Sequence, residues 1–237
     1  MDRVSRFANL SYECLLSGMK IKCALIVLII SLPLANVHAE SEAHKVLQNV
    51  AQASGLGAFD QVERLNFTFI AEIGEREITR AWAWSPKAER VVFQPGSEGA
   101  VRYQRADVDG RPELRAIDQK FVNDLYWLIF PFTVAWDATV DLEVILPDQF
   151  SADIEAEGGL RVIYPEGVGY TPGDVYEIYY DEANLVSAWV FRKGGSVTPT
   201  RVTTWENYQT IGPLTLSLER PAPTGDFRIS FEKVSIE

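Results

Sequence analysis

Three carboxylates, Glu177, Asp181 and Glu206, are the side chains of this 237-residue chain best suited to acid–base chemistry. They lie on or beside segments rich in aromatic residues, and a glycosidase needs only two carboxyl groups about 5–10 Å apart. Most other acids alternate with apolar residues in predicted strands, where contact with water explains them. We therefore expect a protein that is not an enzyme, and keep hydrolysis by a carboxylate pair as an alternative.

Other catalytic and metal-binding side chains are scarce. Beyond residue 39 the chain has a single histidine, His44, and no cysteine, because Cys14 and Cys23 both come earlier. This composition excludes a histidine cluster, a thiol nucleophile, a disulfide and a zinc–thiolate site. The glycine-rich stretch 167–174 precedes a predicted strand, whereas a phosphate loop needs a helix start behind it. We expect no metal and no cofactor.

The first 39 residues have the pattern of an export signal. A basic stretch, Met19-Lys-Ile-Lys22, precedes an apolar run over 23–35, and Val37-His-Ala39 offers the small residues that a signal peptidase accepts. Residues 1–18 are interpreted as an upstream extension. The predicted organisation is an extension with a cleaved signal peptide over 1–39 and one domain over 40–237, located in the periplasm or secreted. Cys23 opens the apolar run, so we expect no lipid-modified cysteine and no permanent membrane anchor.

The chain is acidic, with a formal net charge of −11. The predicted signal segment holds four Lys or Arg and two Asp or Glu, so its removal takes the charge to −13. Such a balance argues against binding to nucleic-acid phosphates or, by charge, to an anionic lipid surface.

The most apolar part of the domain is 124–137, Asp-Leu-Tyr-Trp-Leu-Ile-Phe-Pro-Phe-Thr-Val-Ala-Trp-Asp. Its five aromatic side chains would each bury roughly 150–250 Å², and it is shorter than the roughly 20 apolar residues that cross a bilayer. It must cover the core or a cavity. We predict a helix from Glu113 to about Ile129, stopped by Pro131, which lies as a lid across the concave face of a sheet. Trp136 would then lead back into the sheet.

Two periodicities organise the rest of the domain. A helical period over 41–54 places Val46, Leu47, Val50 and Ala51 on one face, with Gly55 as a stop. Alternation of apolar and polar residues predicts eleven or twelve antiparallel strands. They are 65–73, 76–84, 89–93, 99–105, 140–146, 150–156, 160–164, 175–180, 185–192, 200–208, 214–219 and 226–236. The apolar phase slips in the last strand, which predicts a β-bulge near Glu232 and Lys233. A sheet of this length must curl, close or split.

Aromatic residues are the strongest functional signal, with 25 Phe, Trp or Tyr among the 198 residues from 40 to 237. They could fill a core between two sheets, or they could line a concave face that is closed over an apolar ligand. On the second interpretation the wall and lid of the cavity comprise Phe67, Phe69, Trp82, Trp84, Trp127, Phe130, Phe132, Trp136 and Trp189.

The order of elements resembles that of the lipoprotein-localisation carriers, the LolA/LolB-like family and its outer-membrane lipoprotein-sorting branch. Four stretches carry the resemblance. They are Ala43-His-Lys-Val-Leu to Gly57 leading into 65–69; Tyr126-Trp-Leu-Ile-Phe-Pro-Phe; 167–180 with 185–191; and Thr204-Trp-Glu-Asn-Tyr208 before 214–220. The resemblance implies an unclosed antiparallel β half-barrel of about 11 strands with an N-terminal helix and a central helical lid, whose interior receives acyl chains.

Three classes of function follow from these features. The first is a periplasmic binding or carrier protein for an acyl chain, lipid or lipoprotein, which could meet an envelope protein transiently. The second is a carbohydrate-binding or carbohydrate-active domain that uses tryptophan platforms and a carboxylate pair. The third is an envelope-assembly module whose apolar segment docks a partner protein.

Overall fold

The structure, a computed structural model, describes residues 34–96, 99–151, 154–167 and 170–237, and residues 34–237 form one unit. The predicted extension and most of the predicted signal peptide lie outside the described residues, so cleavage after Ala39 stays a prediction. In the described ranges no helix is both long and apolar enough to cross a membrane.

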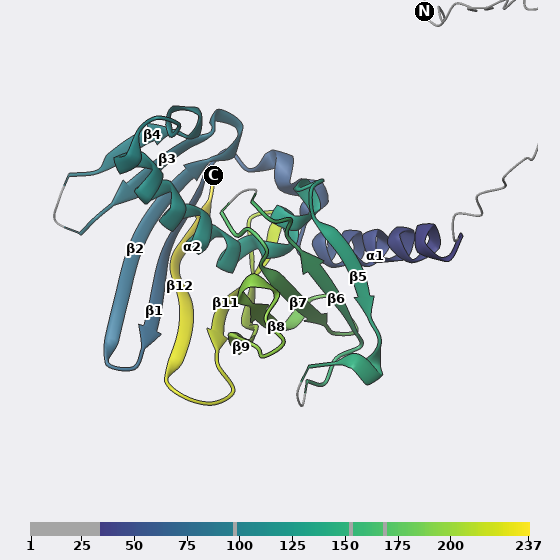
Figure 1. The fold of residues 1–237 in the computed structure, drawn as a ribbon. Helices are drawn as coiled ribbons and strands as arrows, with labels where there is room; N and C mark the ends of the chain where they lie inside the picture. Colours follow the sequence, from purple (N-terminus) through teal and green to yellow (C-terminus); the bar gives the residue numbers. More distant parts are fainter. Residues whose placement is uncertain (1–33, 97–98, 152–153, 168–169) are drawn as a thin grey trace, which may run out of the picture. The chain divides into compact units, whose positions relative to one another are not determined.

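Twelve strands of the described residues form two antiparallel sheets (Figure 1). The seven-stranded sheet has the order β10-β11-β12-β1-β2-β3-β4. Its strands are β1 (Leu65–Ile73), β2 (Arg76–Ser85), β3 (Arg90–Gln94), β4 (Val101–Gln104), β10 (Glu206–Ile211), β11 (Leu214–Pro221) and β12 (Phe227–Ile236). The five-stranded sheet runs in sequence order from β5 to β9. Its strands are β5 (Asp141–Ile145), β6 (Gly158–Ile163), β7 (Val175–Tyr180), β8 (Val186–Arg192) and β9 (Arg201–Thr204).

The chain passes from one sheet to the other at Trp205, the single residue between β9 and β10. The strand predicted over 200–208 is therefore two strands, interrupted where the indole of Trp205 is buried between the sheets. The backbone N–H of Trp205 still donates to the carbonyl oxygen of Ser187, at 2.8 Å. The outer strands β4 and β5 do not pair within the described residues, so the predicted unclosed, mainly β architecture is confirmed.

The phase slip in the last strand marks a bulge, as predicted. The register between β1 and β12 shifts between Asn66, opposite Ser235, and Thr68, opposite Glu232. Two residues of β12, Lys233 and Val234, thus face one residue of β1. Lys233 takes a left-handed conformation, with φ of 51°. An extra residue of this kind bends a strand and increases its twist.

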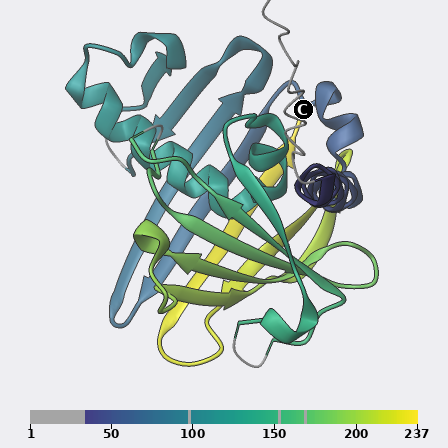
Figure 2. The ribbon, with the colours of Figure 1, turned by 45° about the vertical axis from the view of Figure 1, so that its right-hand side comes forward.

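Helix α1 (Leu34–Ala53) begins before the predicted start at residue 41 and includes the predicted cleavage site. Its buried face of Leu47, Val50 and Ala51 packs against the five-stranded sheet and the central helix. Figure 2 shows this helix nearly end-on. Gly55 ends the helical region as predicted, because its φ is +103° and a Cβ there would lie 2.6 Å from the carbonyl oxygen of Pro213.

The central helix α2 (Pro112–Trp136) continues through Pro131, so the predicted stop at that residue is wrong. Proline removes one backbone donor and its ring crowds the carbonyl four residues earlier, which ends or kinks a helix. Here the backbone of Ile129 absorbs the kink, with φ of −128° and ψ of 32°. Burial of Phe130 and Phe132 stabilises the second half. Trp136 is the last helical residue, and four residues separate it from strand β5, so the chain returns to a sheet soon after it.

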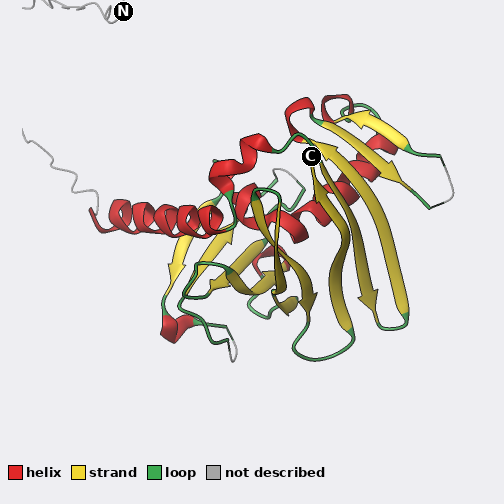
Figure 3. Cartoon of the chain, turned by 180° about the vertical axis from the view of Figure 1, so that it is seen from behind, coloured by secondary structure: helices red, strands yellow, loops and turns green. Residues whose placement is uncertain are grey.

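The same helix lies against the inner face of the seven-stranded sheet, as expected for a central helical lid. Its side chains Phe121, Leu125, Leu128 and Phe132 share one buried cluster with aromatic residues of β1 and β2. Figure 1 shows α2 running in front of β2, β1 and β12, and the view from behind shows these strands in front of the helix (Figure 3).

Residues 150–156, predicted as a strand, are in no strand where the structure describes them. After the short helix η4 (Pro147–Gln149), the described residues of this segment lie on the outer face of the five-stranded sheet. Phe150 and Ile154 pack there against a cluster that contains Tyr179 and Val190. The alternating apolar side chains of Phe150 and Ile154 thus cover a face of the sheet and do not indicate a strand.

Candidate binding site

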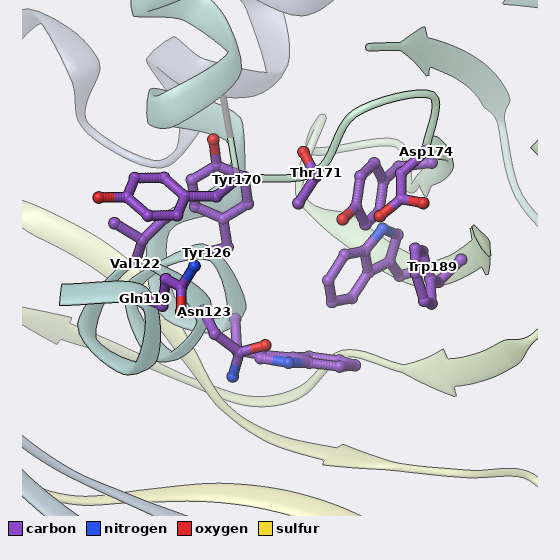
Figure 4. A pocket seen from close by; sticks show the side chains of 11 residues that line it. Gln119, Val122, Asn123, Tyr126, Tyr170, Thr171, Asp174 and Trp189 are labelled. Carbon is purple, nitrogen blue, oxygen red and sulfur yellow. The ribbon is translucent and has the colours of Figure 1, made fainter. Parts of the chain in front are cut away.

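A cavity of about 320 Å³, the first cavity, lies between α2, residues 170–174 and the inner face of β7 and β8 (Figure 4). Residues 170–174 are called the segment that ends at Asp174. Its lining combines aromatic rings with a few polar groups. The lining residues are Gln119, Val122, Asn123, Tyr126, Trp127, Tyr170, Thr171, Asp174, Tyr176, Trp189 and Phe191.

A second cavity of about 300 Å³ lies on the inner face of β1, β2 and β12. It shares Asn123, Trp127 and Phe191 with the first cavity. The remaining lining residues are Phe69, Ala71, Ile73, Ile78, Arg80, Thr200, Arg201, Phe227 and Ile229. The two cavities are therefore neighbours, with the indole of Trp127 on their common border.

The common border is built from packed aromatic rings. Trp127 contacts Trp189 edge to face, with 4.1 Å between the ring centroids, and lies 6.0 Å from the ring of Phe227. On the five-stranded sheet, Tyr176 stacks on both Trp189 and Phe191, at 5.3 and 5.1 Å. Such ring pairs each contribute about 0.5–1.5 kcal/mol beyond the burial of their area. The wall of the first cavity is thus preformed.

An ion pair fixes α2 over the seven-stranded sheet. Asp124 on α2 is fully buried and accepts two hydrogen bonds from Arg80 on β2, at 2.6 and 2.5 Å. The indole N–H of Trp82 donates to the same carboxylate at 2.8 Å, and Asn123 donates at 3.0 Å. Burial raises the pKa of Asp124, and the hydrogen bonds from Arg80, Asn123 and Trp82 oppose that shift. This network sets the position of Asn123, which lines both cavities.

A second buried carboxylate, Asp118, holds the segment that borders the first cavity. The hydroxyl of Tyr170 donates to Asp118 Oδ2 at 2.6 Å, and that of Tyr103 donates to Oδ1 at 2.9 Å. Arg105 donates to both oxygens, at 3.2 and 3.3 Å. Burial and the contact with Asp118 raise the pKa of Tyr170, so its hydroxyl remains a hydrogen-bond donor at neutral pH. The ring of Tyr170 is in this way fixed to α2.

The nine aromatic residues predicted as wall and lid are divided among several places. Trp127 and Trp189 line the first cavity, and Phe69 and Trp127 line the second. Trp84 and Trp136 line a separate groove of about 510 Å³ beside Phe59, where Trp136 is 47% exposed. The other four, buried in the core and outside these cavities, are Phe67, Trp82, Phe130 and Phe132. Side chains of α2, such as Phe121, fill that part of the inner face.

Polar residues of the site were not predicted. Gln119 and Asn123 lie four residues apart, which places them on one side of α2, and both line the first cavity. The sequence feature that could have indicated them is a pair of polar residues on the predicted helix, directly before its most apolar part. Tyr170 and Thr171 belong to the glycine-rich stretch 167–174 before β7, and the sequence offers no direct sign that this stretch returns to α2.

The carboxylates considered for catalysis have structural partners. Glu177 is buried and bound by Ser151, Arg161, Tyr179 and Arg192. Asp181 accepts the backbone N–H groups of Ala183 and Leu185 in the turn before β8. Glu206 accepts from the hydroxyl of Thr204. Across the described ranges no group of three or more His, Cys, Asp or Glu could hold a metal ion.

The tryptophans do not form the exposed platforms that a carbohydrate site uses. Four of the six are buried, namely Trp82, Trp84, Trp189 and Trp205. Trp127 is half-buried and lines both cavities. Only Trp136 has a large exposed surface. Enclosed rings favour an apolar guest over a sugar that stacks on an open face.

No family model and no curated protein matches the chain. Solved structures with a similar arrangement include a DUF1329 family protein from Desulfovibrio piger, 10% identical, with a TM-score of 0.47 over 84% of this chain and 93% of that one. A LolA superfamily protein from Nitrosomonas europaea is 9% identical, with a TM-score of 0.47 over 82% and 93%. An outer membrane lipoprotein-sorting protein domain from Vibrio parahaemolyticus is 10% identical, with a TM-score of 0.44 over 84% and 93%. The last two carry the names of the family that the sequence resembles. At these scores the similarity concerns the arrangement of strands and helices and does not bear on ligands.

Proposed function

We propose that this protein is a binding or carrier protein of the cell envelope that holds an acyl chain of a lipid or lipoprotein between α2 and the two sheets. The observation that carries the proposal is the pair of neighbouring cavities that share Trp127. Each has a volume near the lower end of the roughly 300–1,000 Å³ typical of small-molecule sites. An acyl chain that passes the edge of Trp127 would occupy both.

The lining supplies both affinity and direction. Each methylene group that leaves water contributes about 0.8 kcal/mol, and the rings of Trp127, Trp189 and Phe227 offer it an apolar surface. Polar groups of Gln119, Thr171 and Asp174 gather on the first cavity. A few such groups among apolar walls fix the orientation of a ligand.

Export to the periplasm belongs to the same proposal. It rests on the basic and apolar pattern of residues 19–39 and on the absence of cysteine beyond residue 23. The acidic charge disfavours nucleic acid as a partner. A periplasmic carrier would receive its ligand from one envelope protein and deliver it to another.

Organic extraction of the natively purified protein, followed by mass spectrometry, tests the proposal directly. We expect a co-purified lipid or fatty acid, and displacement of the fluorescent probe 1-N-phenylnaphthylamine by long-chain fatty acids. A Trp136→Ala variant serves as control, because Trp136 lines neither cavity. A protein that yields no lipid and binds neither the probe nor fatty acids would overturn the proposal.

A further inference from the structure

Arg220 is a fully buried cation on the inner face of the seven-stranded sheet. On β11 it continues the alternate positions of Leu214, Leu216 and Leu218, all of which face the core. Directly opposite it on β12 is Ile229, which lines the second cavity. An arginine at an apolar position of a strand is costly, because burial of a charge without a partner is strongly unfavourable.

The guanidinium group is enclosed by rings but only partly hydrogen-bonded. Its central carbon lies 3.8 Å from the centroid of the Trp205 ring and 5.2 Å from that of Phe231. Nη1 donates to the carbonyl oxygen of Ser217 at 2.9 Å and to its hydroxyl at 3.1 Å. Nε and Nη2 have no hydrogen-bond partner among the residues that the structure describes. The aromatic rings thus cover the guanidinium, and two donors along one edge stay unused.

Those two nitrogens are the pair that binds carboxylates elsewhere in the molecule. Four other arginines donate from both Nε and Nη2 to a single carboxylate group: Arg80 to Asp124, Arg105 to Asp118, and Arg161 and Arg192 to Glu177. The parallel N–H groups of this fork match the two oxygens of a carboxylate. Arg220 forms no ion pair with a carboxylate of the described ranges.

The charge of Arg220 persists in this position. Burial lowers the pKa of Arg220 to about 9, and Tyr208 opposes that shift, so the side chain is cationic at neutral pH. The hydroxyl of Tyr208 donates to the carbonyl oxygen of Val186 and does not neutralise it. Two further groups nearby lack partners within the described residues, the indole N–H of Trp205 and the hydroxyl of Thr203. The junction of the two sheets therefore holds several unused polar groups around one cation.

We propose that Arg220 is the anchor of an anionic ligand, and that its Nε and Nη2 bind the two oxygens of a fatty-acid carboxylate. Arg220 itself does not line the second cavity, but its cross-strand neighbour Ile229 does, and the acyl chain extends from the guanidinium past Ile229 and Phe227 into that cavity. This inference rests on the proposed function and gives it a ligand class, a free fatty acid bound with its carboxylate inward. Exclusion of water strengthens such an ion pair, which makes the carboxylate the most discriminating part of the ligand.

Binding of hexadecanoate and of hexadecanol, measured by displacement of 1-N-phenylnaphthylamine, tests the inference. The two ligands share the chain and differ in the group that would meet Arg220. We expect the wild-type protein to bind hexadecanoate at least tenfold more tightly, a difference of about 1.4 kcal/mol. The Arg220→Met variant should lose that preference and bind hexadecanol within about twofold of the wild type. Arg220→Lys, which retains charge but not the fork, should retain part of the preference.

Two further measurements, the stability of the Arg220→Met variant and the ionisation state of the bound ligand, separate the proposed role of Arg220 from a loss of folding. Replacement of a buried charge by an apolar side chain of similar size is often neutral or stabilising, so Arg220→Met should unfold at the same or higher urea concentration. In the wild-type protein, the ¹³C signal of carboxyl-labelled hexadecanoate should stay at its ionised position below the ordinary pKa of a carboxyl group. Equal wild-type affinity for acid and alcohol, or a preference that survives in Arg220→Met, would overturn the anchor but not the carrier function. Failure to bind either ligand would overturn the carrier function itself.

Discussion

The indole of Trp127 on α2 meets the indole of Trp189 on β8 edge to face, with 4.1 Å between the ring centroids and 74° between the ring planes. Through this contact one residue of the central helix both packs on the five-stranded sheet and borders two cavities. Trp127 therefore forms part of the partition between the two cavities, together with Asn123 and Phe191.

Truncation of that side chain should join the cavities. We expect Trp127→Ala to destabilise the protein by about 3 kcal/mol, at the low end for truncation of a large aromatic residue because Trp127 is only half-buried. The ligand preference of the Trp127→Ala variant should shift towards longer or bulkier acyl chains. Urea denaturation would measure the loss of stability, and displacement by a series of fatty acids of roughly 12 to 20 carbons would measure the ligand preference. Trp136→Ala should alter neither, and an unchanged chain-length profile in Trp127→Ala would contradict the role of Trp127 as partition.

Local periodicity predicted most of the strands because each strand has one buried and one exposed face. The bulge in β12 was also predictable, since the apolar phase itself slips between Phe231 and Val234. Alternation over 150–156 was misleading, because Phe150 and Ile154 cover the outer face near Tyr179 without a partner strand. Whether an alternating segment pairs with a neighbouring strand or packs on the face of a sheet depends on residues distant in sequence. A local pattern does not contain that information.

The position of α2 over the sheet depends on its ion pair with β2. Replacement of Asp124 by asparagine leaves Arg80 without its bidentate partner, and we expect a loss of about 3–5 kcal/mol in the free energy of unfolding. Glu63→Gln is the matched control, because its pair with Lys87 is exposed and contributes about 0–1 kcal/mol.

A double variant, Arg80→Met with Asp124→Leu, should recover much of the stability because no buried charge is left unpaired. Urea unfolding of the three variants provides the comparison. Equal losses in Asp124→Asn and Glu63→Gln would show that the buried pair does not hold the helix.

The candidate site was only partly predictable from the sequence. Trp127 and Trp189 were expected in the wall because aromatic residues gather in 124–137 and on the apolar phase of β8. Arg220 was missed, although it shares its phase with Leu214, Leu216 and Leu218 and is the charged exception in that series. Its surroundings depend on the rings of Trp205 and Phe231, which come from other parts of the chain and lie against its guanidinium.

The segment that ends at Asp174 should control how quickly a ligand leaves the first cavity. The hydroxyl of Tyr170 ties it to Asp118 at 2.6 Å, and a hydrogen bond to a charged group contributes about 1.5–3 kcal/mol. Tyr170→Phe should therefore raise the ligand dissociation rate by roughly tenfold, measured by stopped-flow displacement. Tyr103→Phe removes another hydrogen bond to Asp118 but lines neither cavity. A similar rate increase in both variants would attribute the effect to Asp118 and not to the segment.

Acid stability should depend on Glu177, which links the segment around Ser151 to β6 and β8. Burial alone would raise its pKa, but hydrogen bonds from Ser151, Arg192 and Tyr179 prevail and lower it. The native state then binds this proton less tightly than the unfolded chain does. The stabilisation is therefore complete above the unfolded pKa of about 4.3 and is lost as pH falls through the lower native pKa.

The variant Glu177→Gln should be less stable at neutral pH by about 3 kcal/mol, because Arg192 and Arg161 lose their shared buried partner. Its stability should also fall less steeply below about pH 4.3, the ordinary pKa of glutamate. Urea midpoints measured from neutral to acidic pH test both expectations. Glu143→Gln is the control, since Glu143 pairs with Arg161 at the surface and contributes about 0–1 kcal/mol. An acid limb of equal slope in wild type and Glu177→Gln would mean that other carboxylates govern acid unfolding.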